Sequence, residues 1–144
     1  SGINLKSSNL NTANLSNGVL IEANLSETRM NQTNFENANL NHADLTNSFA
    51  SGTNFRDAFM IKANLEGAFL IKADFKNGFL MEANLSNCSL AETNFENANL
   101  YKANFKGATG LTIEQLSKAK SLYLASFDPE LQVQLEEHMP DLIG

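Results

Sequence analysis

The sequence predicts an all-β solenoid, and three observations on its 144 residues lead to this fold class. An apolar residue recurs at every fifth position from Leu5 to Phe105. A small residue usually stands two positions before it, with Asn or Asp between the two. The chain also contains 21 Asn, all before residue 110. A period of five fits neither the helical period of 3.6 nor the strand period of 2, so the backbone must turn a corner every five residues.

The repeated unit therefore describes a four-sided solenoid whose large central residue and preceding small residue point inward. Ala50 is the one undersized central residue. The central positions are Leu5, Leu10, Leu15, Leu20, Leu25, Met30, Phe35, Leu40, Leu45, Ala50, Phe55, Met60, Leu65, Leu70, Phe75, Leu80, Leu85, Leu90, Phe95, Leu100 and Phe105.

On these residues the chain resembles the pentapeptide-repeat family, over about residues 3 to 109. The resemblance implies a right-handed quadrilateral parallel β-helix that completes one coil in four repeats. We expect about five coils, stacked roughly 4.8 Å apart. The expected domains are a β-helix over residues 1–110 and a short C-terminal α-helical cap over residues 111–144.

Residues 20 apart should stack, which sorts the central positions into four columns. Stacked rings at strand spacing fill an interior densely, so we assign the aromatic column to the core. This structural core is Leu15, Phe35, Phe55, Phe75 and Phe95. A second inward column runs from Leu5 through Leu85 to Phe105.

Two opposite sides carry columns of outward Asn and Asp. Such residues tolerate corner conformations, and stacked amides can bond one another along the rod. These predicted ladders are Asn4, Asn24, Asp44, Asn64, Asn84 and Asn104 on one side, and Asn14, Asn34, Asn54, Asp74 and Asn94 on the other.

The other two sides carry large apolar residues that should face outward, a pattern typical of association surfaces. One side carries Phe49, Phe69 and Ile71. On the opposite side the predicted interaction surface is Val19, Ile21, Phe59, Ile61, Phe79, Met81 and Tyr101. Two alternatives stay open: strain at Ala50 turns Phe49 inward, or flat solenoid sides simply tolerate exposed apolar residues.

After Phe105 the repeat decays through residues 107–110, and two short helices are predicted. Thr112 and Gln115 form a capping box that opens a helix to about Ala119. Asp128, followed by Pro129, opens a second helix to about His138. The expected lid over the last coil is Leu111, Leu116, Leu122, Leu124, Phe127, Leu131 and Leu135.

At the other end the first coil has no visible cap. We expect a missing preceding segment or another chain to cover it, and Ser1-Gly2 is interpreted as a cleavage remnant. The C-terminal segment also resembles that of cyanobacterial pentapeptide-repeat proteins. The location stays open between the cyanobacterial cytoplasm and, if a leader was removed, the thylakoid lumen or periplasm.

No enzyme chemistry is indicated. The sequence has no nucleophile paired with a base, no Cys/His metal spacing and no phosphate loop. We therefore expect no catalytic residue, metal, cofactor or small-molecule substrate. His42 is assigned to an outward corner, and Cys88 to an inward packing position. No apolar run reaches the roughly 18 residues of a membrane span, so no membrane insertion is expected.

Three functions are compatible with the sequence. The sequence favours a non-enzymatic scaffold that presents its sides to an unknown protein partner or, as a homodimer, to itself. The resemblance implies the alternative, because some family members imitate duplex DNA and protect type II topoisomerases from quinolones. Residues 1–110 carry 10 acidic and 8 basic residues, which gives too weak an acidic track for that imitation. An enzyme with an unrecognised site is the third reading, and no nucleic-acid partner is expected.

Overall fold

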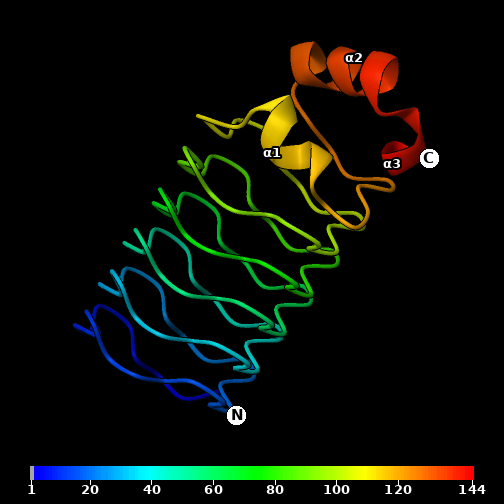
Figure 1. Ribbon diagram of the computed structural model, residues 1–144. Coiled ribbons are helices and arrows are strands. Elements are labelled where there is room, and N and C mark those ends of the chain that lie inside the picture. Colours follow the sequence, from blue (N-terminus) through cyan, green and yellow to red (C-terminus); the bar gives the residue numbers. More distant parts are fainter. Residues whose placement is uncertain (1) are drawn as a thin grey trace.

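The structure, a computed structural model, describes residues 2–144, and Ser1 of the expected cleavage remnant lies outside them. The chain winds into a rod of stacked coils, with the N-terminus at one end and three short helices at the other (Figure 1). This rod is a β-solenoid.

Parallel bridges between residues 20 apart set the register. Asn4 pairs with Asn24, and the same spacing continues along that side to the pair of Asn84 with Asn104. The other three sides follow the same rule, so each coil contains four repeats. Each side contributes an isolated bridge rather than a long strand, because the backbone turns again before a strand can extend.

Local hydrogen bonds explain why the repeat needs Asn or Asp before the central residue. The Asn64 side-chain oxygen accepts a hydrogen bond from the N–H of Glu66 at 3.1 Å, and the same contact recurs in most repeats. Two residues after each central position φ is positive, as at Lys62 with a φ of 57°. The Asn side chain therefore holds a tight corner that the backbone alone does not satisfy.

In the repeat of Phe59, an Asn side chain from the preceding coil replaces this local contact. Phe59 stands where most repeats have Asn, so the N–H of Ile61 lacks its usual acceptor. Asn41, one coil earlier, accepts that hydrogen bond through its side-chain oxygen at 2.8 Å. At Phe59, therefore, an aromatic side chain replaces Asn without loss of this backbone hydrogen bond.

The interior is a continuous apolar column. Phe35, Phe55, Phe75 and Phe95 are buried, and their rings stack in sequence with centroids 4.9–5.6 Å apart and planes within 5°. Leu15, in the first coil, is half-buried.

Amide bonds between coils form on only one of the two predicted ladders. Asn54 donates to Asn34 at 3.3 Å, and Asn94 donates to Asp74 at 3.1 Å. On the side that begins at Asn4, no side-chain bond joins stacked Asn or Asp residues in the described chain. There the Asn and Asp oxygens accept local backbone N–H groups instead.

The C-terminal segment contains α1 (Ile113–Ser117), α2 (Pro129–His138) and α3 (Pro140–Ile143). Both hydrogen bonds of the capping box at Thr112 are present, but α1 ends at Ser117 rather than near Ala119. Helix α2 has the predicted bounds, and α3 was not predicted. Asp128 makes no capping bond to α2, because its carboxylate accepts the Gly107 N–H at 3.1 and 3.2 Å.

Between α1 and α2 the chain again forms parallel backbone bridges with the solenoid, which corrects the expectation that the repeat is lost after residue 110. Ser121 pairs with Asn99, and Ser126 with Asn104, both 22 residues apart. The two extra residues accommodate α1, and Ser replaces the usual Asn, so the five-residue pattern is not visible in this segment of the sequence.

Six of the seven residues expected in the lid are buried or half-buried. Leu124 is the exception: it occupies a turn position with a φ of 60° and is 51% exposed. The buried lid residues are Leu116, Leu122, Phe127 and Leu135, with Leu111 and Leu131 half-buried.

Candidate interaction surface

The Phe59 side, defined as Phe59, Ile61, Phe79 and Met81, brings together four of the seven predicted interaction residues. Phe59 and Phe79 are 40% and 37% exposed, whereas Ile61 and Met81 are half-buried. Phe59 forms a parallel bridge with Phe79, which places the two outward rings one coil apart. Their centroids lie 4.8 Å apart with planes 5° apart, so they form one stacked aromatic surface.

The remaining predicted residues lie at the margins. Val19 is 72% exposed but is separated from Phe59 by the coil that contains Asn39. Ile21 is half-buried in the same early coil. Tyr101 follows Met81 by one coil and stacks on Tyr123 with ring centroids 6.0 Å apart, so it extends the surface toward the C-terminal helices.

The opposite side, defined as Phe49, Phe69 and Ile71, is a second aromatic surface. Phe49 and Phe69 are 44% and 43% exposed, and their rings stack 5.2 Å apart. Phe49 therefore points outward, which excludes the alternative that strain at Ala50 turns it inward. Ile71 is 39% exposed, so the two surfaces are similar in chemistry and in the exposure of their largest side chains.

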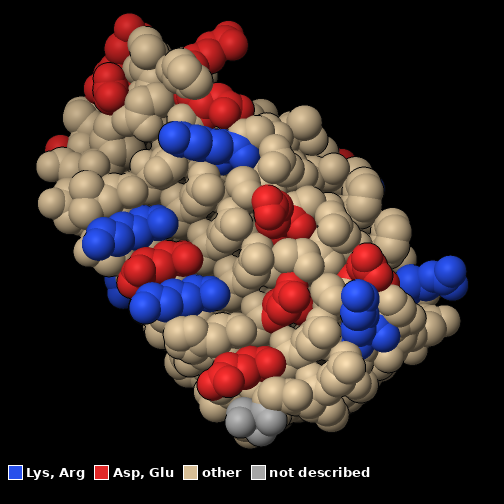
Figure 2. All heavy atoms as spheres, turned by 180° about the vertical axis from the view of Figure 1, so that it is seen from behind, with Lys and Arg blue, Asp and Glu red and all other residues tan. Residues whose placement is uncertain are grey.

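Charged side chains of both signs are mixed on the solenoid. The Arg56 Nε lies 3.4 Å from the Asp74 Oδ2. The Lys76 Nζ lies 3.8 Å from the Glu96 Oε2. Figure 2 shows acidic and basic side chains interspersed over one face, with acidic ones gathered near the C-terminal end at the top. The coils thus present mixed charge rather than a continuous acidic track.

Neither candidate for reactive chemistry lies in a suitable environment. Cys88 is buried and its Sγ donates to the Leu65 carbonyl at 2.9 Å. Burial raises the pKa of this thiol from 9.0 to about 12, so it stays protonated at neutral pH. His42 is exposed at a turn position. Within residues 2–144, no three His, Cys, Asp or Glu side chains gather as a metal site would require.

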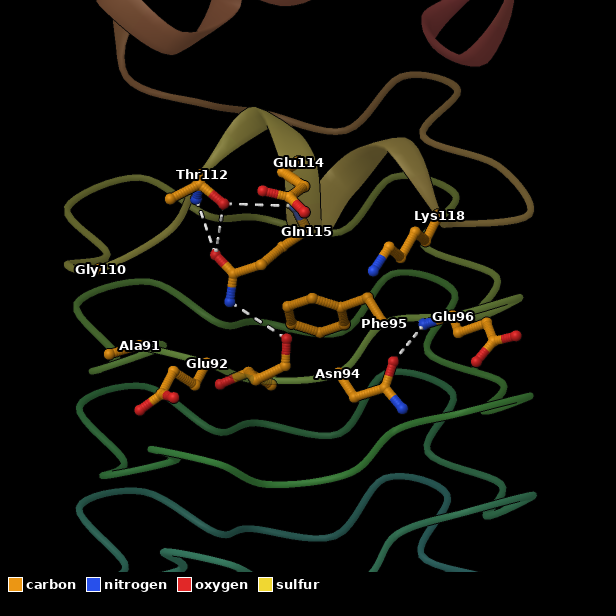
Figure 3. A pocket seen from close by; sticks show the side chains of 11 residues that line it. Ala91, Glu92, Asn94, Phe95, Glu96, Gly110, Thr112, Glu114, Gln115 and Lys118 are labelled. Carbon is orange, nitrogen blue, oxygen red and sulfur yellow. Dashed lines mark hydrogen bonds between the residues drawn. The ribbon is translucent and has the colours of Figure 1, made fainter.

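Sequence reasoning missed a cavity of about 620 Å³ between α1 and the last coil (Figure 3). Gln115, which the sequence marks as part of a capping box, also reaches down from α1. Its Nε2 donates to the carbonyls of Leu90 and Thr93. The sequence shows the capping-box spacing of Thr112 and Gln115. It does not show the bonds from Gln115 to Leu90 and Thr93, because those bonds depend on tertiary structure.

The coil register and the outward sides define a β-solenoid built from five-residue repeats. The family model for pentapeptide repeats matches in 8 copies, over residues 1–37, 38–77 and 80–109. The chain therefore belongs to the pentapeptide-repeat family. No curated protein sequence matches it significantly.

Solved structures of similar fold include three pentapeptide-repeat or related proteins. Trypsin-treated QnrB1, a plasmid-mediated fluoroquinolone resistance protein, aligns with a TM-score of 0.74 and 18% identity over 92% of this chain. The alignment spans 64% of the QnrB1 chain, less than two thirds of its length.

A thylakoid-lumen protein of Arabidopsis thaliana gives a TM-score of 0.62 at 18% identity, covering 92% of this chain and 77% of its own. HetL of the cyanobacterium Nostoc, involved in heterocyst differentiation regulation, gives 0.50 at 25% identity, covering 87% and 64%. Along the described part of the chain, no helix combines the length and apolarity of a membrane span.

Proposed function

We propose that this protein is a non-enzymatic scaffold whose Phe59 side binds a protein partner or a second copy of the chain. The observation that carries the proposal is the stacked, outward pair of Phe59 and Phe79 with Ile61 and Met81 beside it. Aromatic residues and Met are enriched at protein interfaces, and adjacent exposed apolar groups are unfavourable in water unless a partner covers them.

The rigidity of the scaffold supports the proposal. The backbone at Phe59 is held by two bonds to the preceding coil: its N–H donates to the Ala38 carbonyl at 2.9 Å, and its carbonyl accepts from the Leu40 N–H at 2.6 Å. Its ring is held by stacking on the ring of Phe79. Side chains held in this way lose little conformational entropy when a partner covers them, which favours association.

We further infer that the solenoid is a right-handed quadrilateral parallel β-helix of about five coils, with residues 111–144 as its C-terminal cap. The four bridges per 20 residues and the buried apolar residues of α1 and α2 support this description. An end cap protects the apolar cross-section and the free edges of the last coil.

The experiment compares molar mass by light scattering for the wild type, Phe59→Ser/Phe79→Ser, and the matched control Phe49→Ser/Phe69→Ser, at low and high salt. A wild-type dimer that only the first variant dissociates would assign the Phe59 side to self-association. A monomer in all three, or a dimer that neither variant dissociates, would exclude self-association through the Phe59 side and leave that side for a foreign partner.

The alternative is a DNA-mimic protein that binds a type II topoisomerase and protects gyrase, suggested by the fold shared with QnrB1. Charge weighs against it. Residues 1–110 carry 10 acidic and 8 basic residues, whereas residues 111–144 carry 6 and 2. Imitation of a phosphate backbone needs a continuous negative potential, and Lys62, Lys72 and Lys102 interrupt it.

A gyrase supercoiling assay with a fluoroquinolone separates the two functions. The scaffold account predicts that the protein does not restore supercoiling. Protection that weakens as salt is raised would instead favour the DNA-mimic function.

A further inference from the structure

The face of the rod that carries the Phe59 side has six outward positions joined by parallel bridges. In order along the rod they are Val19, Asn39, Phe59, Phe79, Asn99 and Ser121. Phe59 and Phe79 are the third and fourth of the six, so the stacked pair lies at the middle of this face. A twofold axis that crosses the rod between the two rings would lay a second copy antiparallel on the first, over the whole length of the face.

Charged corner residues run along one edge of this face. Lys62 and Glu82 stand three residues after Phe59 and Phe79, at corners with φ of 57° and 60°. Both side chains are exposed, and neither makes an ion pair within residues 2–144. The twofold axis places Lys62 of each copy opposite Glu82 of the other. Two ion pairs would therefore form at the centre of such a dimer.

The neighbouring corners add no like-charged pair. On the edge of Lys62, the next residues brought together are His42 and Lys102, and His42 carries no formal charge at pH 7. On the other edge, Asp57 lies opposite Asn77. The charge pattern of this face is thus complementary to itself when one copy is reversed.

The ends of the face supply further apolar contacts. The axis brings residues 19–22 of one copy opposite residues 121–124 of the other. Val19, Tyr123 and Leu124 are 72%, 47% and 51% exposed, respectively. Within one chain Val19 lies at the opposite end of the face from Tyr123 and Leu124, whereas the antiparallel arrangement brings these exposed apolar groups together.

The Phe49 side lacks this complementarity. Its rings, Phe49 and Phe69, also occupy consecutive bridged positions and stack on each other. The corners three residues after them are Gly52 and Lys72, so a twofold axis between the rings would place each lysine opposite a glycine. The two sides are alike in their aromatic residues, and only the Phe59 side pairs opposite charges.

The charge of the C-terminal segment favours the antiparallel over the parallel orientation. In a parallel dimer Lys62 would lie opposite Asp57, so the ion pairs alone do not decide. Residues 111–144 carry 6 acidic and 2 basic residues, which gives this segment a net charge of −4. Parallel copies would place the two acidic segments side by side, whereas antiparallel copies place them at opposite ends. Repulsion between like charges therefore disfavours the parallel dimer.

We propose that the Phe59 side binds a second copy of this chain in an antiparallel, twofold-symmetric dimer, in which Lys62 of each copy pairs with Glu82 of the other. The inference rests on the function proposed above and names the partner of that surface. Each Phe59 ring lies opposite the Phe79 ring of the second copy. The rings supply the buried apolar area, and the ion pairs fix the register.

The first test measures the dimer dissociation constant by sedimentation equilibrium at pH 7. Protein concentrations extend to about 1 mM, because one side of a narrow rod makes a small and therefore weak interface. Lys62→Glu should raise the dissociation constant by roughly 2- to 30-fold, since two exposed ion pairs are lost. The matched control is Lys72→Glu, which changes the net charge equally at the equivalent corner of the Phe49 side. Equal effects of the two variants would overturn the proposal.

Charge exchange tests the orientation. Lys62→Glu/Glu82→Lys leaves the net charge unchanged and should restore the wild-type dissociation constant, because the same ion pairs form with their signs exchanged. In a parallel dimer the introduced glutamate would face Asp57, and the double variant would stay weakened. A mixture of Lys62→Glu with Glu82→Lys should likewise form heterodimers that are tighter than either homodimer. A double variant as weak as Lys62→Glu would overturn the antiparallel register.

Phe59→Ser/Phe79→Ser separates this inference from the proposed function. A wild type that stays monomeric up to about 1 mM, or a dimer that this variant leaves intact, would overturn the inference while leaving the Phe59 side to a foreign partner. A dimer that this variant dissociates, but in which charge exchange does not restore affinity, would retain the proposed function and overturn the antiparallel dimer.

Discussion

The ring of Phe127 stacks on the ring of Phe105, with centroids 5.3 Å apart and planes 2° apart, although 22 residues separate them. Phe105 is the last central residue of the regular repeats, and it also meets Phe95 edge-on. Phe127 therefore continues the inward column after α1. The C-terminal segment is attached to the solenoid by the same packing that joins one coil to the next.

Phe127→Ala should remove this attachment. Loss of a buried Phe typically lowers the free energy of unfolding by about 3–5 kcal/mol. Urea unfolding followed by circular dichroism measures the change, with Leu124→Ala as the control because Leu124 is exposed in the same segment. Equal stability of the two variants would show that the aromatic stack does not hold the segment.

Leu65→Asp and Phe75→Asp should each prevent folding. Both side chains are fully buried in a narrow apolar interior, where an unpaired carboxylate can be neither hydrated nor compensated. The β spectrum and the soluble yield report the outcome. Asn37→Asp, at an exposed turn, should fold normally. Folded, soluble core variants would refute the inward register.

Ser48→Ala should stabilise the protein by roughly 1 kcal/mol. The Ser48 hydroxyl is buried and has no hydrogen-bond partner in the described chain, so its removal relieves a desolvation cost. Thr53→Val is the matched comparison and should lower the free energy of unfolding, because the buried Thr53 hydroxyl donates to the Met30 carbonyl at 2.5 Å. Chemical denaturation should give opposite signs for the two substitutions, and a loss of stability in Ser48→Ala would be inconsistent with an unpaired hydroxyl.

Because the Cys88 thiol is buried, we expect the protein to lose stability at alkaline pH. Its pKa rises from 9.0 to about 12 on folding, so the unfolded chain releases this proton first. The stability contribution is fully present below pH 9.0 and is lost as pH rises toward 12, approaching about 1.4 kcal/mol per pH unit. Unfolding of the wild type and Cys88→Ala, compared at pH 8 and 10, isolates this effect from other titrating groups. Parallel pH profiles would contradict the burial of the thiol.

The sequence predicted those features of the fold in which the same position of the repeat has the same structural role in every coil. The five-residue period was sufficient to separate the inward Phe55 and Phe75 from the outward Phe59 and Phe79. These positions follow from backbone register, which the repeat specifies without any knowledge of distant contacts.

Features that depend on contacts between unlike segments were not predictable in the same way. Ser121 and Ser126 form parallel bridges with residues 22 positions earlier, instead of 20, because α1 occupies two additional residues. Asp128 has the sequence position of a helix cap, yet its carboxylate binds Gly107.

The most direct test of the central claim is the oxidation of outward rings by hydroxyl radicals, read by mass spectrometry. It is measured in buffer at low and high protein concentration, and in concentrated cyanobacterial lysate. We predict that Phe59 and Phe79 become protected at high concentration or in lysate, while Phe49 and Phe69 react as before. Unchanged oxidation of both pairs in every condition would contradict the assignment of the Phe59 side as the binding surface.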